Sequence, residues 1–111
     1  MTLFDDREKA YEAEYRQEQE TAFRIMVRRD KLLGLWAAER LGLTGEDALA
    51  YAKGVIAREL GPGGHDLAQA IFTDLAAKGV GVEEADIQTR LLALHEVARE
   101  QVLAEIAGRS A

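Results

Sequence analysis

Residues 25–41, IMVRRDKLLGLWAAERL, decide the fold, because their apolar side chains recur at the spacing of a helix. This spacing places the side chains on one helical face, where they can close a core against other helices. Trp36 is the largest of them, and we expect it to anchor that core. The members of this apolar face are Ile25, Leu32, Leu33, Trp36, Ala37 and Leu41.

The same helix is predicted to extend far toward the N-terminus. No Gly or Pro occurs between Thr2 and Gly34, so nothing in this stretch breaks a helix. Thr2 and Asp5 each stand three residues before an acid, which is the pattern of a capping box. A single helix is therefore expected from Thr2 or Asp5 to about Leu41.

Three further helices follow, separated by the turn signals at 42–45, 61–64 and 79–81. We expect them at Thr44 to Leu60 with Asp47 completing a capping box, at His65 or Asp66 to Lys78, and at Glu83 to about Ala107. Short connections favour antiparallel neighbours, so the predicted fold class is an all-α four-helix bundle. The expected core positions are Ala48, Leu49, Ala52, Val55, Ile56, Leu60, Leu67, Ala68, Ile71, Phe72, Leu75, Ala76, Ile87, Leu91, Leu94, Ala98, Val102 and Ile106.

The composition excludes several classes of protein. A chain of 111 residues fits one domain, and the lack of cysteine rules out disulfides and thiolate–metal sites. A net charge of −6 disfavours nucleic acid as a partner, and no apolar run is long enough to cross a membrane. We expect a cytoplasmic protein that is monomeric when free, with no signal peptide or direct membrane insertion.

The N-terminal part of the long helix has little apolar surface with which to join a core. Most residues from Asp5 to Glu20 are charged, and pairs such as Glu12 with Arg16 add only about 0.2–0.5 kcal/mol each. Residues 1 to about 20 should therefore be only partly helical until something binds them. The sequence predicts a segment 1–22, partly disordered when free, and a bundle core 23–111.

The role of this segment stays open at the level of the residues. A marginal helix with the aromatic positions Phe4, Tyr11 and Tyr15 on a narrow stripe is typical of a ligand that fits a partner's groove. The stripe could equally pack on the bundle itself, or the segment could be a charged tail that serves solubility.

No arrangement of residues predicts catalysis, a metal site or a cofactor. His65 and His95 are the only histidines, and position 99 is Arg where a zinc helix beginning His95-Glu96 would need its second ligand. We therefore expect that the chain is not an enzyme. One basic cluster could hold an anion or meet an acidic surface, although a solvated face is the favoured interpretation; it comprises Arg24, Arg28, Arg29 and Lys31.

Several motifs together resemble one protein family. The chain is similar to the zeta-type F1-ATPase inhibitors of alphaproteobacteria along nearly its whole length and in the expected order. The stretches that carry this resemblance are FDDREKA at 4–10, Arg28-Arg29, KLLGLWAAE at 31–39, Leu41-Gly42, TGE at 44–46, AYAK at 50–53 and DLAAKG at 74–79.

The resemblance implies a four-helix bundle whose N-terminal segment, from Thr2 to about Gln19, inserts between α and β subunits of F1-ATPase. There it would block rotation of the γ subunit in the direction of ATP hydrolysis. The alternative is a helical adaptor or weak nucleotide-binding module that keeps the fold with little inhibition. The contacts that the resemblance implies are Phe4, Asp5, Asp6, Arg7, Ala10, Tyr11 and Tyr15.

Overall fold

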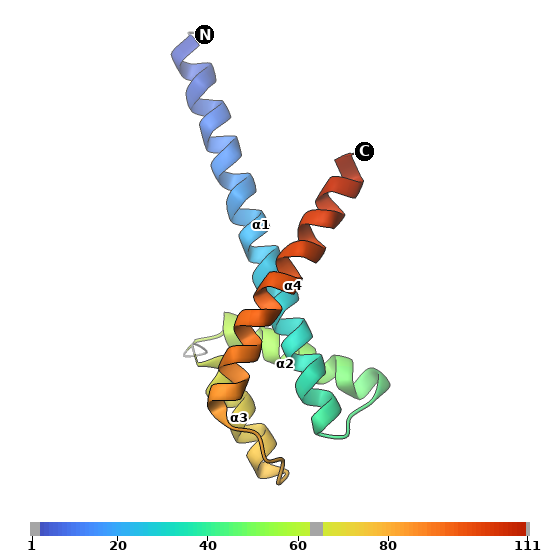
Figure 1. Ribbon diagram of the computed structural model, residues 1–111. Helices are drawn as coiled ribbons and strands as arrows, with labels where there is room; N and C mark the ends of the chain where they lie inside the picture. The colour runs from blue at the N-terminus through green and yellow to red at the C-terminus, as the bar shows by residue number, and fades with distance from the viewer. Residues whose placement is uncertain (1–2, 63–65, 111) are drawn as a thin grey trace.

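The computed structural model describes residues 3–62 and 66–110 and consists of four helices (Figure 1). They are α1 (Leu3–Arg40), α2 (Gly45–Leu60), α3 (Leu67–Ala77) and α4 (Glu84–Ser110). No strand occurs in these described ranges. The predicted fold class, an all-α four-helix bundle, is confirmed, and every described helix boundary lies within three residues of its expected place.

The two long helices cross each other in opposite directions and diverge toward the chain ends (Figure 1). α2 and α3 lie at the other end of the molecule, where α2 packs mainly on α1 and α3 mainly on α4. The result is an elongated molecule of 64 × 33 × 23 Å. The N-terminal half of α1 diverges from α4, and its end reaches beyond the other helices (Figure 1).

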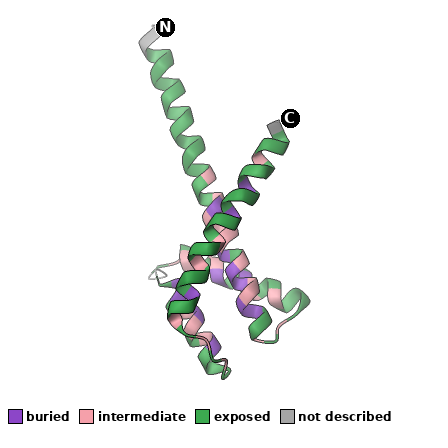
Figure 2. Ribbon diagram, viewed as in Figure 1, coloured by how far each residue is buried: buried purple, intermediate pink, exposed green. Residues whose placement is uncertain are grey.

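The main core lies where all four helices meet, as the buried residues of Figure 2 show. Its members are mostly the aliphatic side chains that the helical stripes predict. Three expected core positions are wrong: Leu49 and Leu60 of α2 and Ala76 of α3 are exposed, because the other helices do not cover the faces that carry them. The main core consists of Leu33, Ala37, Val55, Leu67, Ala68, Ile71, Leu75 and Ile87.

Trp36 is not the centre of this core, which corrects the expectation from sequence. It is partly buried and packs against the core from the edge, while Leu33 and Ile71 are fully buried. The guanidinium groups of Arg40 and Arg90 lie 4.3 and 4.6 Å from the centre of its ring. Such cation–π contacts suit an aromatic ring at a boundary with solvent better than one inside an aliphatic core.

The expected capping box at the start of α2 does not form. The Thr44 side chain makes no capping hydrogen bond, and the next residue, Gly45, has a positive φ of 56°. This left-handed residue turns the chain away from the geometry in which Thr44 would meet the first turn. Asp66, by contrast, caps α3 by accepting a hydrogen bond from the Gln69 amide at 3.0 Å.

α1 and α2 approach each other unusually closely at Gly34. A Cβ atom at this position would lie 2.7 Å from the Cα of Ala52, a distance that real Cβ atoms essentially never show. Both residues are buried, so the backbones of the two helices are nearly in contact here. A glycine in mid-helix costs about 1 kcal/mol relative to alanine, and the close packing of α2 offsets that cost.

A second, smaller apolar cluster joins α1 to α4 alone. Ile25 of α1 packs with Ala98 and Val102 of α4, and Leu32 and Ile106 cover its edges. This cluster lies nearer the diverging ends of the two helices than the main core does (Figures 1 and 2). It therefore fixes the part of α1 from which the N-terminal half projects.

Asp30, which the sequence did not single out, is buried on α1 between the residues of the two clusters. Its Oδ1 accepts a hydrogen bond from Nε of Arg29 at 3.0 Å, while its Oδ2 is buried without a hydrogen-bond partner. Arg29 also pairs with Glu59 of α2 at 3.1 Å. Burial raises the pKa of Asp30 from 3.8 to about 6, although the positive charge of Arg29 opposes the rise.

Asp30→Asn should stabilise the protein at neutral and alkaline pH. Because the folded-state pKa is raised, the unfolded chain loses this proton first, and ionised Asp30 reduces stability as pH rises from about 4 through 6. The asparagine variant should gain up to about 3 kcal/mol at pH 8 and less than about 1 kcal/mol at pH 4. Urea denaturation at both pH values measures this. Glu39→Gln, at an exposed position of α1, is the control, and a gain that does not grow with pH would contradict the prediction.

Gly34→Ala and Gly54→Ala should have opposite effects on stability. The first places a methyl group against the α2 backbone and should lower the free energy of unfolding by about 1–2 kcal/mol. The second fills open space, since nothing lies within 4 Å of its Cβ, and should raise that free energy by about 0.5–1 kcal/mol. Thermal denaturation of the two variants tests the pair. Equal effects of the same sign would show that the close approach of α1 and α2 is not a constraint.

Candidate functional site

The N-terminal half of α1 is a solvent-exposed helix with no core of its own. Every residue from Asp5 to Glu20, a segment called the arm below, is exposed (Figure 2). Thr21 is the first partly buried residue after the arm, and Ile25 is the first buried one. The arm thus projects from a helix that is anchored only beyond residue 21.

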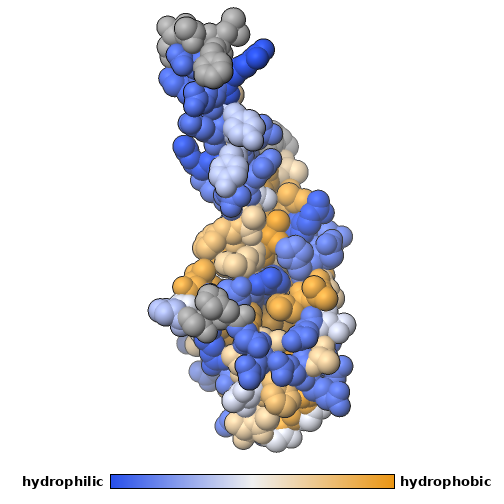
Figure 3. Space-filling view, turned by 90° about the vertical axis from the view of Figure 1, so that its left-hand side faces the viewer, coloured by the Kyte–Doolittle hydropathy of each residue, from blue (hydrophilic) through white to orange (hydrophobic). Residues whose placement is uncertain are grey.

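The arm carries most of the net negative charge of the chain. It contains seven Asp or Glu and three Lys or Arg, which gives a net charge of −4 out of −6 for the whole protein. In Figure 3 the projecting end of the molecule is mostly hydrophilic, while hydrophobic patches lie on the bundle below it. This charge keeps the arm hydrated and favours a partner surface of opposite sign.

Two tyrosines stand out from this charged surface. Tyr11 and Tyr15 are 74% and 59% exposed, and they are four residues apart, so they lie one turn apart on the same face of α1. Together with Glu12, Arg16 and Gln19 they form an apolar surface strip. Large exposed aromatics beside each other are typical of residues that insert into a partner's pockets.

The remaining residues of the predicted inhibitory contact lie on the same arm. Asp5, Asp6, Arg7 and Ala10 are all exposed on its first turns. Phe4 belongs to α1 and precedes Tyr11 by seven residues, which is two helical turns, but its side chain lies outside the described residues, as does Thr2. The structure therefore gathers the described members of this set on one projecting helix.

The predicted basic cluster is divided between two sets of internal ion pairs. Arg24 and Arg28 both reach Glu105 of α4, at 3.5 and 2.6 Å, while Arg29 turns to Asp30 and Glu59. Lys31 is exposed. The hydrogen bond from Arg28 lowers the pKa of Glu105 and so favours its ionised form. Arg24, Arg28 and Lys31 line one surface pocket, whereas Arg29 pairs with Asp30 and Glu59 instead.

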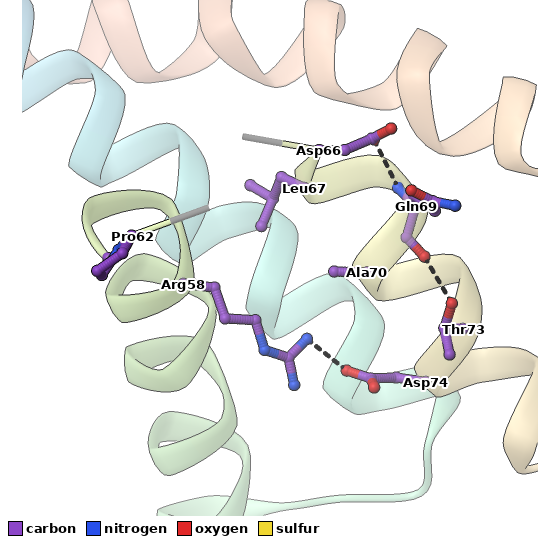
Figure 4. A pocket seen from close by; sticks show the side chains of 9 residues that line it. Arg58, Pro62, Asp66, Leu67, Gln69, Ala70, Thr73 and Asp74 are labelled. Carbon is purple, nitrogen blue, oxygen red and sulfur yellow. Dashed lines mark hydrogen bonds and ion pairs between the residues drawn. The ribbon is translucent and has the colours of Figure 1, made fainter. Parts of the chain in front are cut away.

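A groove between α2 and α3 is one concave feature of the described residues (Figure 4). Asp74 accepts hydrogen bonds from Arg58 at 2.7 Å and from the Tyr51 hydroxyl at 2.8 Å. Burial and the hydrogen bond to Asp74 both raise the pKa of Tyr51. Thr73 donates to the carbonyl oxygen of Gln69. The Thr73 bond lies within α3, whereas the two bonds to Asp74 join α2 to α3, so the groove is best described as part of their packing.

The described part of the chain offers neither a metal site nor a membrane-spanning helix. No group of three or more His, Cys, Asp or Glu there could hold a metal ion. His95 is exposed on α4, and His65 lies outside the described residues. None of the described helices combines the length and the apolar character needed to cross a membrane.

The interactions of Asp30, Gln101 and Glu105 were not predicted from the sequence. A signal for Asp30 was present, since it stands three residues before Leu33 and seven before Ala37, which places it on the core-facing side of a helix. Gln101 and Glu105 lie on a predicted helix whose partner was not known. Their pairing with Arg28 could not be read without the crossing of α1 and α4.

Comparison with known families gives one result. The model of the family described as ATPase inhibitor subunit zeta matches residues 1–101. No curated protein matches the chain. The family match includes the whole arm and the whole main core, and it ends one residue before Val102 of the second apolar cluster.

Proposed function

The chain belongs to the ATPase inhibitor subunit zeta family, and on that premise we propose that its arm inhibits ATP hydrolysis by F1-ATPase. The protein acts as a regulator, and the arm enters a catalytic interface between an α and a β subunit, where it obstructs the γ subunit. The observation that carries this proposal is the arm itself, a helix of 16 consecutive exposed residues continuous with the anchored part of α1.

The dimensions of the arm suit insertion between two subunits. At 1.5 Å per residue, residues 5–20 extend about 24 Å, which is long enough to enter a protein interface deeply. The bundle at the other end of α1 is too broad to follow, since the molecule measures 33 × 23 Å across its shorter axes. The bundle therefore stays outside the interface and limits how far the arm enters.

The side chains of the arm contribute to binding in two ways, as aromatic contacts and as charges that attract the partner at long range. Tyr11 and Tyr15 supply exposed aromatic area on one face, in the manner of a helix that binds a groove. The acidic residues Asp5 and Asp6, together with the excess of Glu along the arm, supply long-range attraction to a basic surface. Inhibition should consequently begin more slowly at high ionic strength.

The division of the chain into two functional parts belongs to the same proposal. Residues 1–22 form the inhibitory segment, partly disordered in the free protein, and residues 23–111 form the bundle that carries it. Binding then orders the segment, and part of the interaction free energy is spent on that ordering. Through F1 the protein is associated with the membrane-bound ATP synthase on its cytoplasmic side.

Ala13→Pro should abolish inhibition without unfolding the bundle. Proline at this exposed position removes one backbone hydrogen bond and clashes with the preceding turn, which costs about 3 kcal/mol of local helix stability between Tyr11 and Tyr15. ATP hydrolysis by purified F1-ATPase, measured against added protein, should no longer decrease, while the melting temperature should change little. Ala13→Ser keeps the helix and is the matched control. A melting temperature that falls strongly in the proline variant would show that the arm is part of the bundle.

Replacing Tyr11 and Tyr15 together by alanine should weaken inhibition by about tenfold or more, as expected for aromatic anchors. The helix should be retained, because alanine is the best helix former. Leu92→Ala is the control, since Leu92 is a comparably exposed apolar residue of α4, 75% exposed, far from the arm along the chain. The inhibition constant for F1-ATPase measures both. An equal loss in the control variant would mean that the tyrosines have no special role.

A further inference from the structure

Four polar residues link α1 to α4 immediately after the arm. Glu105 accepts from Nη2 of Arg28 at 2.6 Å through one carboxylate oxygen and from Arg24 at 3.5 Å through the other. Gln101 accepts from Nη1 of Arg28 at 3.1 Å. Arg24, Arg28, Gln101 and Glu105 are called the clamp below.

The clamp lies over the second apolar cluster. Ile25 is between Arg24 and Arg28 in the chain, and Val102 is between Gln101 and Glu105, so polar and apolar contacts alternate along the same two helices. The clamp and the cluster together fix one turn of α1, residues 24–28, against α4. This turn begins four residues after the last residue of the arm.

A fixed turn in this position has a specific consequence for the arm. Forming the first turn of a helix is unfavourable, whereas each residue added to an existing turn gains a hydrogen bond at much lower cost. The arm has no buried residue, so packing does not supply that first turn. The packed part of α1 does supply it, and the turn held by the clamp and Ile25 is the last packed turn before the arm, which continues the same helix without a Gly or Pro.

We propose that the clamp holds the last packed turn of α1, from which the arm helix propagates, and that Arg28 and Glu105 are therefore positioning residues for inhibition. The second part rests on the function proposed above. Neither residue needs to touch the partner. Glu105 and Val102 act on the arm through α1, by keeping helical the end from which the arm grows.

A purely structural role for the clamp makes different predictions. If the clamp only added stability to the bundle, its loss would lower the melting temperature and leave residues 12–20 as they were. If it nucleates the arm, its loss should reduce hydrogen-exchange protection in residues 12–20, which do not touch it, while the main core stays intact. Exchange in the arm is therefore the readout that separates the two roles.

The test uses the full-length chain with Glu105→Gln and with Val102→Ala combined with Glu105→Gln. Glu100→Gln is the control, because Glu100 is an exposed acid of α4 outside the clamp. We expect the double variant to lose protection in residues 12–20 and to need about fivefold or more protein for the same inhibition of F1-ATPase. Its melting temperature should fall by about 5–10 °C, because Val102 is buried in the second apolar cluster.

A rescue experiment makes the test specific for nucleation. Thr21 lies between the arm and the clamp in the chain. The substitution Thr21→Ala raises the helix propensity at this position. Added to the double variant, it should restore part of the protection and part of the inhibition. Unchanged arm exchange in the double variant, or no recovery with Thr21→Ala, would overturn the role of the clamp. Failure of the wild-type protein to inhibit would instead overturn the proposed function, since the exchange measurement does not depend on F1-ATPase.

Discussion

The contact between Gly34 and Ala52 brings the backbones of α1 and α2 together, and the direction of α1 depends on it. With α2 close on one side and α4 crossing on another, the C-terminal half of α1 is held by both neighbours. A helix is stiff over a few turns, so fixing one half also fixes the direction in which the other half leaves. The projection of the arm is thus a consequence of packing more than 10 residues away in the chain.

The two apolar clusters divide the stabilisation of so small a protein. The main core joins all four helices, whereas the second cluster joins only α1 and α4. Asp30 lies on α1 between them, and its ionised form opposes folding at neutral pH. A buried carboxylate with one unpaired oxygen is retained at a cost in stability.

The sequence was sufficient to predict the four helices and the exposure of the arm, because periodicity, turn residues and charge are local properties. It was not sufficient for features that depend on how helices cross. Leu49 and Leu60 continue an apolar stripe, yet no helix covers them; Trp36 is large, yet it lies at the edge. The arginines of the basic cluster were visible, but their partners Glu59 and Glu105 lie 30 or more residues away in the chain.

The composition of the arm and the presence of the clamp follow from one conflict. An arm with enough apolar surface to be stable alone would pack on the bundle or associate with other copies. A charged arm avoids both, but its helix is marginal in water. An arm that must be both exposed and helical therefore needs its stability from outside its own sequence. Residues 24–28, held by α4 through Ile25 and Arg28, are placed where they can provide it.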